Sequence, residues 1–219
     1  MVPAQINIAI VAHPSRMDIA RQLYREIDAD DRDRCLCNDM RIFIDNNGDG
    51  ALKTHTRALL WASTTRLPTV ILEDDAEPVV GFSKKVVEII GRHAGSPISF
   101  YLGTGRPPQY QDVIREAVES GADYLRLPTL IHGVSYYVPA ELLRGNISRI
   151  RIDDTLPADY AIGKMVGRDF IYPLPSLADH LDGESVENHK DGEKRTEKRK
   201  AWKLSGKTIR KAETFIAKG

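Results

Sequence analysis

The sequence predicts an α/β fold in which helices flank a mixed, mostly parallel sheet. Short apolar runs of strand length alternate with segments whose apolar residues recur at helical spacing. Proline and glycine clusters separate these segments. Hydrophobic residues make up 42% and charged residues 28% of the 219 residues, which is enough for a packed core. Strands that alternate with helices favour parallel pairing.

The first half of the chain shows this alternation most clearly. Residues 5–13 form an apolar strand, and Pro14 ends it because proline has no N–H to donate. Ser15 and Asp18 are typical of a helix N-cap and its reciprocal acid. The following helix has apolar Met17, Ala20, Leu23, Tyr24 and Ile27. We then expect a loop over 29–39, a strand over 40–44, a turn over 45–50, a helix over 52–63 and a strand over 69–72.

The second half continues the pattern. Pro78 can open a helix whose apolar positions are Phe82, Val86, Val87, Ile89 and Ile90. Gly121 is a suitable C′ residue for a helix over 109–120. The remaining predicted strands cover 98–102, 124–127, 134–138 and 170–172, and the remaining helices cover 139–143 and 157–167.

Charge divides the chain into two parts. The 31 basic and 31 acidic side chains cancel overall, but residues 189–219 hold eleven basic and four acidic ones, a net charge of +7. The preceding residues therefore carry −7. We predict an acidic folded domain over 1–182 and a basic linker with a helical C-terminal extension over 183–219. Apolar stretches are too short for a membrane span and no secretory signal is recognisable, so we expect a cytoplasmic location.

Three adjacent acids follow the apolar strand 69–72. Glu73, Asp74 and Asp75 would repel one another, and a divalent cation would remove that cost. Mg²⁺ and Mn²⁺ favour carboxylate oxygens, often together with substrate phosphates. Ligands of open α/β sheets bind beyond the carboxyl ends of strands, which is where this motif stands. The motif therefore predicts a metal–diphosphate site, with a solvated acidic turn as the alternative.

Three histidines are candidate site residues: His13, His132 and His180. His13 could contact a nucleotide, because it stands at the end of the first strand. Taken as isolated residues, His13, His132 and His180 are more often structural than functional.

Four segments resemble one family of sugar transferases. They are His55-x-x-Ala58-Leu59, the acidic stretch 70–76, the stretch 133–139 with Tyr136, and Pro175-Ser176-Leu177-Ala178-Asp179-His180 followed by Ser185. Their order and spacing resemble glycosyltransferase family 25, which includes lipopolysaccharide sugar transferases and collagen galactosyltransferases. The resemblance spans residues 6–185 and implies a GT-A type, Rossmann-like fold that uses a nucleotide-sugar donor.

The resemblance also implies roles for individual residues. Asp75 would ligate Mn²⁺ or Mg²⁺, with Glu73 and His180 as further ligands. Glu73 could instead contact the ribose of a UDP-linked donor, and Asp74 could orient the sugar. The nucleotide pocket would be lined by His13, Pro14, Arg16, Asp45 and Asn46.

Transfer to a hydroxyl with inversion needs a general base. Asp154 and Asp159 are the candidates, because the family-like pattern places an acid on the acceptor side. An acid here could equally be a helix N-terminal charge that the helix dipole stabilises.

The basic extension indicates which class of acceptor the chain would use. Lysine and arginine runs attract phosphates, and an interleaved tryptophan can stack on a base. The candidate nucleic-acid-binding residues are Lys198, Arg199, Lys200, Trp202 and Lys203. Small GT-A-like enzymes with basic extensions resemble phage-encoded transferases, which implies a hydroxymethylated pyrimidine in DNA as acceptor and the host cytoplasm as location. The alternatives are a lipopolysaccharide or other carbohydrate acceptor, a protein acceptor, or a nucleotide- or nucleic-acid-binding module without catalysis.

Overall fold

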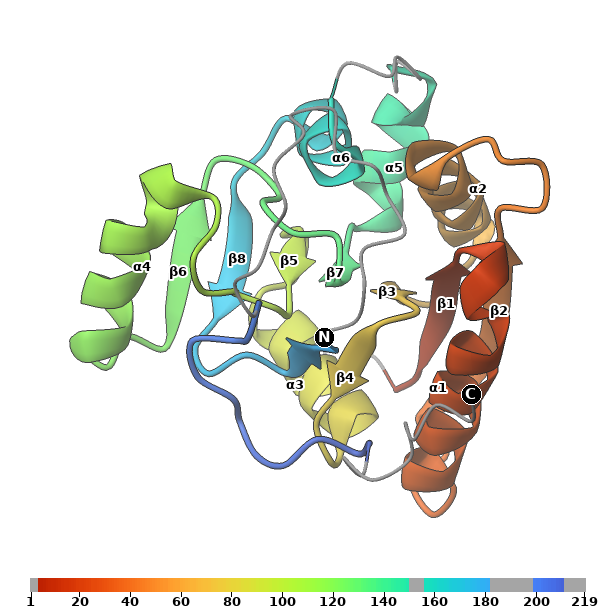
Figure 1. Ribbon diagram of the computed structural model, residues 1–219, viewed down its shortest axis with the longest axis horizontal. Coiled ribbons are helices and arrows are strands. Elements are labelled where there is room, and N and C mark those ends of the chain that lie inside the picture. Colours follow the sequence, from red (N-terminus) through yellow and green to blue (C-terminus); the bar gives the residue numbers. More distant parts are fainter. Residues whose placement is uncertain (1–3, 150–155, 182–198, 211–219) are drawn as a thin grey trace, which may run out of the picture.

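The computed structural model describes residues 4–149, 156–181 and 199–210 of the chain (Figure 1). Its strands are β1 (Ile6–Ala12), β2 (Cys37–Ile44), β3 (Thr69–Glu73), β4 (Ala76–Pro78), β5 (Ile98–Ser99), β6 (Tyr124–Leu127), β7 (Ser135–Tyr137), β8 (Phe170–Pro173) and β9 (Ala178–His180). Its α-helices are α1 (Met17–Asp31), α2 (Ala51–Thr64), α3 (Phe82–Arg92), α4 (Pro108–Glu119), α5 (Ala140–Asn146) and α6 (Ala158–Val166). Two 3₁₀ turns are η1 (Pro14–Arg16) and η2 (Ile147–Arg149).

The central sheet is mixed, as the sequence predicts. Its order is β2-β1-β3-β7-β5-β8-β6. β1 pairs in parallel with β2 and β3, and β5 pairs in parallel with β8, whereas β7 and β6 run antiparallel to their neighbours. Five of the seven strands therefore point in one direction. β4 and β9 form a separate antiparallel pair, in which Ala76 lies opposite His180 and Pro78 lies opposite Ala178. The pair therefore joins segments that lie about a hundred residues apart in the chain.

Helices cover both faces of the sheet, because alternate strand residues point to opposite faces. Ile8 and Ile10 of β1 pack in one core cluster with side chains of α1 and α3. Ala9 and Val11 pack in a second cluster with side chains of α2, α4, α5 and α6. The molecule is thus a three-layer α/β structure, which confirms the predicted α/β class with a mixed sheet flanked by helices.

Two local predictions need correction. α1 extends to Asp31 and β2 begins at Cys37, so the loop expected over 29–39 is shorter. The buried Asp31 carboxylate accepts a hydrogen bond from Cys37 N at 2.7 Å, and this contact shapes the short connection. Pro78 ends β4 and does not open a helix, and α3 begins at Phe82.

The basic extension also differs from the prediction. Residues 199–210 form an extended segment and not a helix, while 183–198 and 211–219 lie outside the described residues. Isolated β-bridges join the segment to the body at Ala201, Leu204 and Thr208. Among the described helices, none is sufficiently long and apolar to cross a bilayer.

Candidate functional site

The acidic motif stands at the carboxyl edge of the central parallel strands. Glu73 ends β3, and Asp74 and Asp75 form the turn into β4. Asp74 N donates to Val11 O at 3.0 Å, and Leu181 N donates to Asp75 O at 2.8 Å. These backbone bonds tie the turn to β1 and to the residue after β9, so the position of the acids is fixed by the two sheets.

Arg16 provides the positive charge beside two of these acids. Its Nη1 atom lies 3.2 Å from Asp74 Oδ1 and 2.6 Å from Asp75 Oδ2. Asp74 Oδ2 also accepts a hydrogen bond from His13 N at 3.0 Å. Burial, and then the charge of Asp75, raise the pKa of Asp74 to about 6, and Arg16 and His13 offset part of that rise. One guanidinium therefore compensates two neighbouring carboxylates.

β9 brings His180 to the same place from the far end of the domain. His180 is paired with Ala76 across the β4–β9 ladder. Its Nε2 atom lies 3.4 Å from Asp75 Oδ2, and both residues are buried. The structure therefore brings together Asp75 and His180, two of the three predicted metal ligands, although they lie 105 positions apart in the printed sequence.

The donor set around Asp75 fits a divalent cation. Asp75 Oδ1 and His180 Nδ1 are both buried, and neither has a hydrogen-bond partner in the described part of the chain. Carboxylate and imidazole are accepted by Mn²⁺, and Mg²⁺ typically takes only one or two carboxylates with substrate phosphates and water. Across the described ranges no group of three His, Cys, Asp or Glu side chains is arranged to hold a metal. The described residues thus offer two candidate ligands at this position, Asp75 and His180.

Glu73 faces a different partner. Its Oε1 atom lies 3.3 Å from His55 Nε2, and His55 Nδ1 lies 2.9 Å from the Tyr136 hydroxyl. Burial acts to raise the pKa of Glu73, but the hydrogen bond and charge of His55, with the charges of His180 and Arg199, lower it overall. Gly133 makes room for this carboxylate, since a Cβ atom there would lie 2.5 Å from Glu73 Oε1.

Asp159 lies in the electrostatic field of this network. It stands in the first turn of α6, and its Oδ1 atom accepts a hydrogen bond from Tyr160 N at 2.9 Å. Burial, and then the negative charge of Glu73, raise its pKa to about 6, while His55 acts in the opposite direction. Asp154, the other candidate base, lies outside the described residues.

The predicted nucleotide-pocket residues gather at the ends of β1 and β2. The imidazole of His13 caps η1, where its Nδ1 atom accepts from Ser15 N at 3.2 Å. Asp45 N donates to Ala12 O, and the Asp45 carboxylate accepts from Asp49 N and Gly50 N at 2.7 and 2.8 Å. Pro14 and Asn46 are exposed beside them. The Asp45 side chain shapes the loop before α2, because its two carboxylate oxygens accept these two backbone hydrogen bonds.

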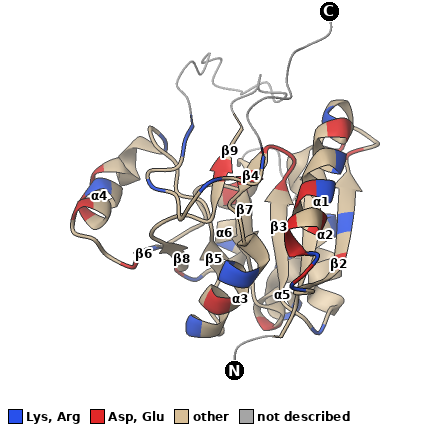
Figure 2. Cartoon of the chain, turned by 90° about the horizontal axis from the view of Figure 1, so that it is seen from below, with Lys and Arg blue, Asp and Glu red and all other residues tan. Residues whose placement is uncertain are grey.

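The extended C-terminal segment, residues 199–210, runs across the β4–β9 pair. Figure 2 shows its basic residues beside acidic residues of these two strands. Lys200 Nζ lies 3.2 Å from Glu77 Oε2 and 3.7 Å from Asp179 Oδ2. Lys200 therefore compensates acids of the domain itself.

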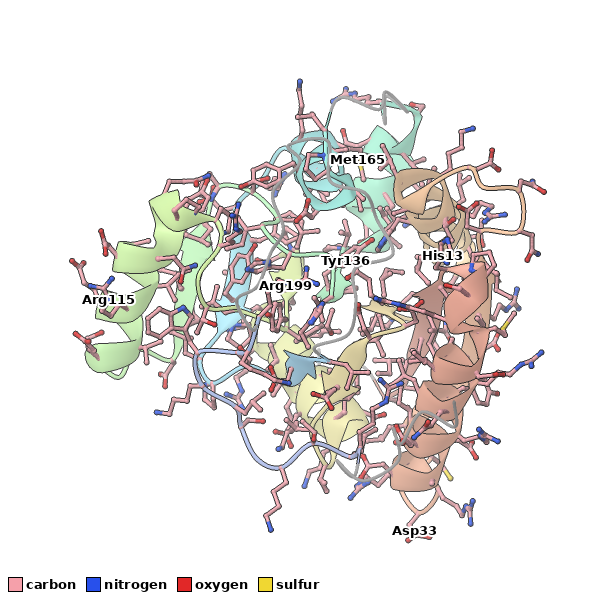
Figure 3. The ribbon with its side chains drawn as sticks, in the orientation of Figure 1. His13, Asp33, Arg115, Tyr136, Met165 and Arg199 are labelled. Carbon is pink, nitrogen blue, oxygen red and sulfur yellow. The ribbon has the colours of Figure 1, made fainter. Side chains whose placement is uncertain are left out.

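The other predicted nucleic-acid-binding residues have varied surroundings. Trp202 is partly buried against the second core cluster, and its Nε1 atom donates to Gln111 Oε1 at 3.0 Å. Arg199 lies near Glu73 and His132, whose pKa values it lowers. Lys203 is exposed, and Lys198 is not among the described residues. Figure 3 shows Arg199 and Tyr136 in the central part of the molecule and His13 to their right, whereas Asp33 and Arg115 lie at its edges.

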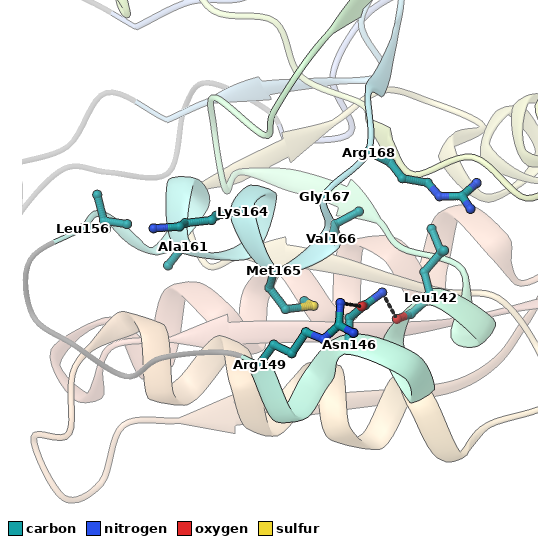
Figure 4. Close-up of a pocket in the computed structure, with 10 residues that line it drawn as sticks. All are labelled: Leu142, Asn146, Arg149, Leu156, Ala161, Lys164, Met165, Val166, Gly167 and Arg168. Carbon is teal, nitrogen blue, oxygen red and sulfur yellow. Dashed lines mark hydrogen bonds between the residues drawn. The ribbon is translucent and has the colours of Figure 1, made fainter.

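A separate pocket of about 670 Å³ lies between α5, η2 and α6 (Figure 4). Its lining combines apolar side chains with three cationic ones, and comprises Leu142, Asn146, Arg149, Leu156, Ala161, Lys164, Met165, Val166, Gly167 and Arg168. None of the predicted site residues lines it. The acidic motif and this pocket are therefore distinct features.

Comparison of the sequence with models of known protein families gives no match, and comparison with curated proteins gives none either. The functional argument consequently rests on the motifs and on the geometry of the site.

Three residues of the site had no role predicted from the sequence. His55 and Tyr136 lie within the family-like segments, but their contact spans 81 positions and joins α2 to β7. Arg210 is buried, and its Nη2 atom donates to Asp74 O at 3.3 Å and to Ile19 O at 2.9 Å. Nothing in a basic tail distinguishes this arginine from its neighbours, so the sequence alone carried no signal for it.

Proposed function

We propose that the chain is a metal-dependent glycosyltransferase that moves a sugar from a UDP-linked donor to a hydroxyl acceptor. One observation carries the proposal: His180 Nε2 lies 3.4 Å from Asp75 Oδ2, beside Arg16, and each of the two residues has a further buried polar atom that lacks a partner among the described residues. They do so at the carboxyl edge of an α/β sheet, where nucleotides bind in such folds. The GT-A-like topology is part of the same proposal.

Several residues of the site would together hold the donor. A divalent ion on Asp75 and His180 would act as a Lewis acid that neutralises charge on the departing diphosphate. Arg16 fixes the orientation of the Asp74 and Asp75 carboxylates. His55 and Tyr136 fix the Glu73 carboxylate on the opposite side of the motif. A preorganised set of this kind lowers the cost of binding a transition state in which charge develops.

Asp159 is the proposed general base. A base must be ionised before it accepts the proton of an acceptor hydroxyl. With a pKa of about 6, Asp159 is mostly ionised at neutral pH and more basic than an ordinary aspartate. Its electrostatic coupling to Glu73 and His55 supports a position beside the donor.

A binding experiment tests the donor site. Calorimetric titration with UDP, in the presence of Mn²⁺ and in its absence, compares the wild type with Asp75→Asn. Asp112→Asn is the matched control, because Asp112 also lies 2.6 Å from an arginine, but on the exposed surface of α4. We expect Mn²⁺-dependent binding in the wild type and the control, and a loss of about tenfold or more in Asp75→Asn. Equal binding by all three proteins would refute the metal site.

The proposed acceptor is a hydroxymethylated pyrimidine in DNA. Its support is the basic run in residues 189–203, of which only the last five are described. Because Lys200 is paired with acids and Trp202 is partly buried, Lys203 is the described member whose exposed side chain is best placed to meet phosphate. Gel-shift titration with hydroxymethylcytosine duplexes should show affinity that falls steeply with salt. Binding that is independent of salt, or absent at low salt, would leave a carbohydrate acceptor as the better hypothesis.

A further inference from the structure

His132 has a buried nitrogen atom that the contacts of the fold leave unused. It lies in the connection between β6 and β7, and its Nε2 atom is buried with no hydrogen-bond partner among the described residues. The other ring nitrogen is left to make the imidazole's hydrogen bond to the backbone of Arg106. This hydrogen bond acts to raise the pKa of the ring, so it favours the protonated form and the ring is its donor. Nδ1 therefore carries the hydrogen.

This arrangement fixes the tautomer. Burial, and then the charge of Arg199, lower the pKa of His132 to about 3, so the ring is neutral at physiological pH. A neutral imidazole has one N–H donor and one acceptor nitrogen. Because Nδ1 donates, Nε2 is an acceptor, and a buried acceptor without a donor is unfavourable until a ligand supplies one.

His132 lies close to two parts of the acidic site, Glu73 and His180. Its ring meets that of Tyr101 edge-on, with centroids 5.0 Å apart, and the centroid of the Tyr101 ring also lies 6.2 Å from that of His180. The next residue is Gly133, whose missing side chain makes room for Glu73. Val134 O then accepts a hydrogen bond from Glu73 N at 3.0 Å. His132 therefore lies near Glu73 and His180, whose charges both act on its pKa.

The chemistry of the atom restricts its partner. Phosphate oxygens are acceptors and cannot satisfy another acceptor, whereas a hydroxyl can donate to it. From this geometry we infer that His132 Nε2 accepts a hydrogen bond from a hydroxyl group of the sugar that the donor carries. The inference rests on the proposed function and adds to it a residue that binds the sugar and not the nucleotide.

The test separates the sugar from the nucleotide. UDP and the UDP-linked sugars UDP-glucose, UDP-galactose and UDP-N-acetylglucosamine are titrated by calorimetry with Mn²⁺ into the wild type and His132→Phe. Phenylalanine keeps the aromatic contact with Tyr101 and removes Nε2. His93→Phe is the matched control, since His93 meets Tyr124 edge-on at the same 5.0 Å centroid distance and an interplanar angle of 70°, against 67° for His132.

We expect UDP to bind all three proteins equally. At least one UDP-sugar should bind His132→Phe about tenfold more weakly than it binds the wild type and His93→Phe. His132→Gln, whose amide oxygen can accept in place of Nε2, should recover part of the loss and also covers the case in which the phenylalanine variant does not fold.

Two results would overturn the assignment of His132 alone. One is unchanged UDP-sugar affinity in His132→Phe. The other is an equal loss of UDP and UDP-sugar affinity, which would indicate a role at the metal or at a donor group of the nucleoside. A wild type that binds neither UDP nor any of the UDP-sugars would overturn the proposed function and this inference together.

Discussion

Arg16 Nη1 lies 2.6 Å from Asp75 Oδ2, and this contact spans 59 positions of the chain. Only 13% of the arginine side chain and 11% of the aspartate side chain are exposed. The contact places a guanidinium where three successive acids would otherwise repel one another. The same carboxylate oxygen faces His180, so Arg16 and a divalent cation would compensate the same charges.

Replacing Arg16 by glutamine tests this shared role. We expect the metal-free variant to lose about 1–3 kcal/mol of stability at pH 7, because Asp74 and Asp75 lose their buried partner. The pKa of Asp74 is already raised to about 6 in the folded chain. Its protonation therefore favours the folded state as the pH falls, and the loss should be smaller at pH 5 than at pH 7.

Thermal unfolding with and without Mn²⁺ gives the second half of this test. Since Mn²⁺ would replace the missing guanidinium, the increase in melting temperature should be larger in Arg16→Gln than in the wild type. An equal or smaller increase would show that Arg16 and the metal do not act on the same carboxylates.

Gly133→Ala tests the placement of Glu73. A Cβ atom at this position would come within 2.5 Å of Glu73 Oε1, the end of a flexible side chain that can move away. We expect a change in the free energy of unfolding of about 1 kcal/mol or less, but a large loss of UDP-sugar turnover because the Glu73–His55 contact breaks. Gly145→Ala is the control, because nothing lies within 4 Å of a Cβ atom there and alanine favours the helix. Wild-type turnover in Gly133→Ala would show that the position of Glu73 is unimportant.

The raised pKa of Asp159 predicts the pH dependence of transfer. As the pH falls through about 6, the Asp159 carboxylate becomes protonated and can no longer accept a proton. The value of kcat/KM should therefore decrease in proportion to the ionised fraction of Asp159. Asp159→Asn should lower the transfer rate about 10²- to 10⁴-fold while UDP binding persists. Transfer by Asp159→Asn at a rate close to that of the wild type would exclude this residue as the base.

The C-terminal segment should contribute to stability and not only to acceptor binding. Trp202 N donates to Leu102 O at 3.0 Å, and Ser176 N donates to Lys203 O at 2.8 Å. We expect Trp202→Ala to cost about 2 kcal/mol in chemical denaturation, because a partly buried indole and its bond to Gln111 are lost. Lys203→Ala, which changes an exposed side chain in the same segment, should leave stability within about 0.5 kcal/mol. If Trp202→Ala unfolds at the same denaturant concentration as the wild type, the segment does not pack on the domain.

Much of the fold was predictable because strand and helix periodicities are local. β1, β3 and α6 were each predicted to within two residues at either end. β4 and β9 were missed, because three-residue strands are too short to show alternation, and Pro78 is a residue that can also begin a helix. That pair matters here, since it is the ladder that places His180 beside Asp75.

The site was predictable only in its individual parts. The three acids and His180 stood out as residue types, yet the sequence alone did not show that Glu73 would face His55 while Asp75 faces Arg16. The basic tail illustrates a different difficulty. A charged run is typical of a solvated or nucleic-acid-binding segment, but tertiary contacts with Glu77 and Asp179 draw Lys200 onto the domain. Such contacts depend on the packing of distant elements, and local composition does not encode them.

The release of UDP from UDP-glucose, UDP-galactose and UDP-N-acetylglucosamine in Mn²⁺ tests whether the chain is a metal-dependent sugar transferase. The wild type should release UDP from at least one of these sugars, with hydroxymethylated DNA present as acceptor. EDTA, or the substitution Asp75→Asn, should reduce the rate about 100-fold or more. Release at the same rate by the wild type and Asp75→Asn, or no release from any of the three donors, would contradict the assignment of a metal-dependent sugar transferase.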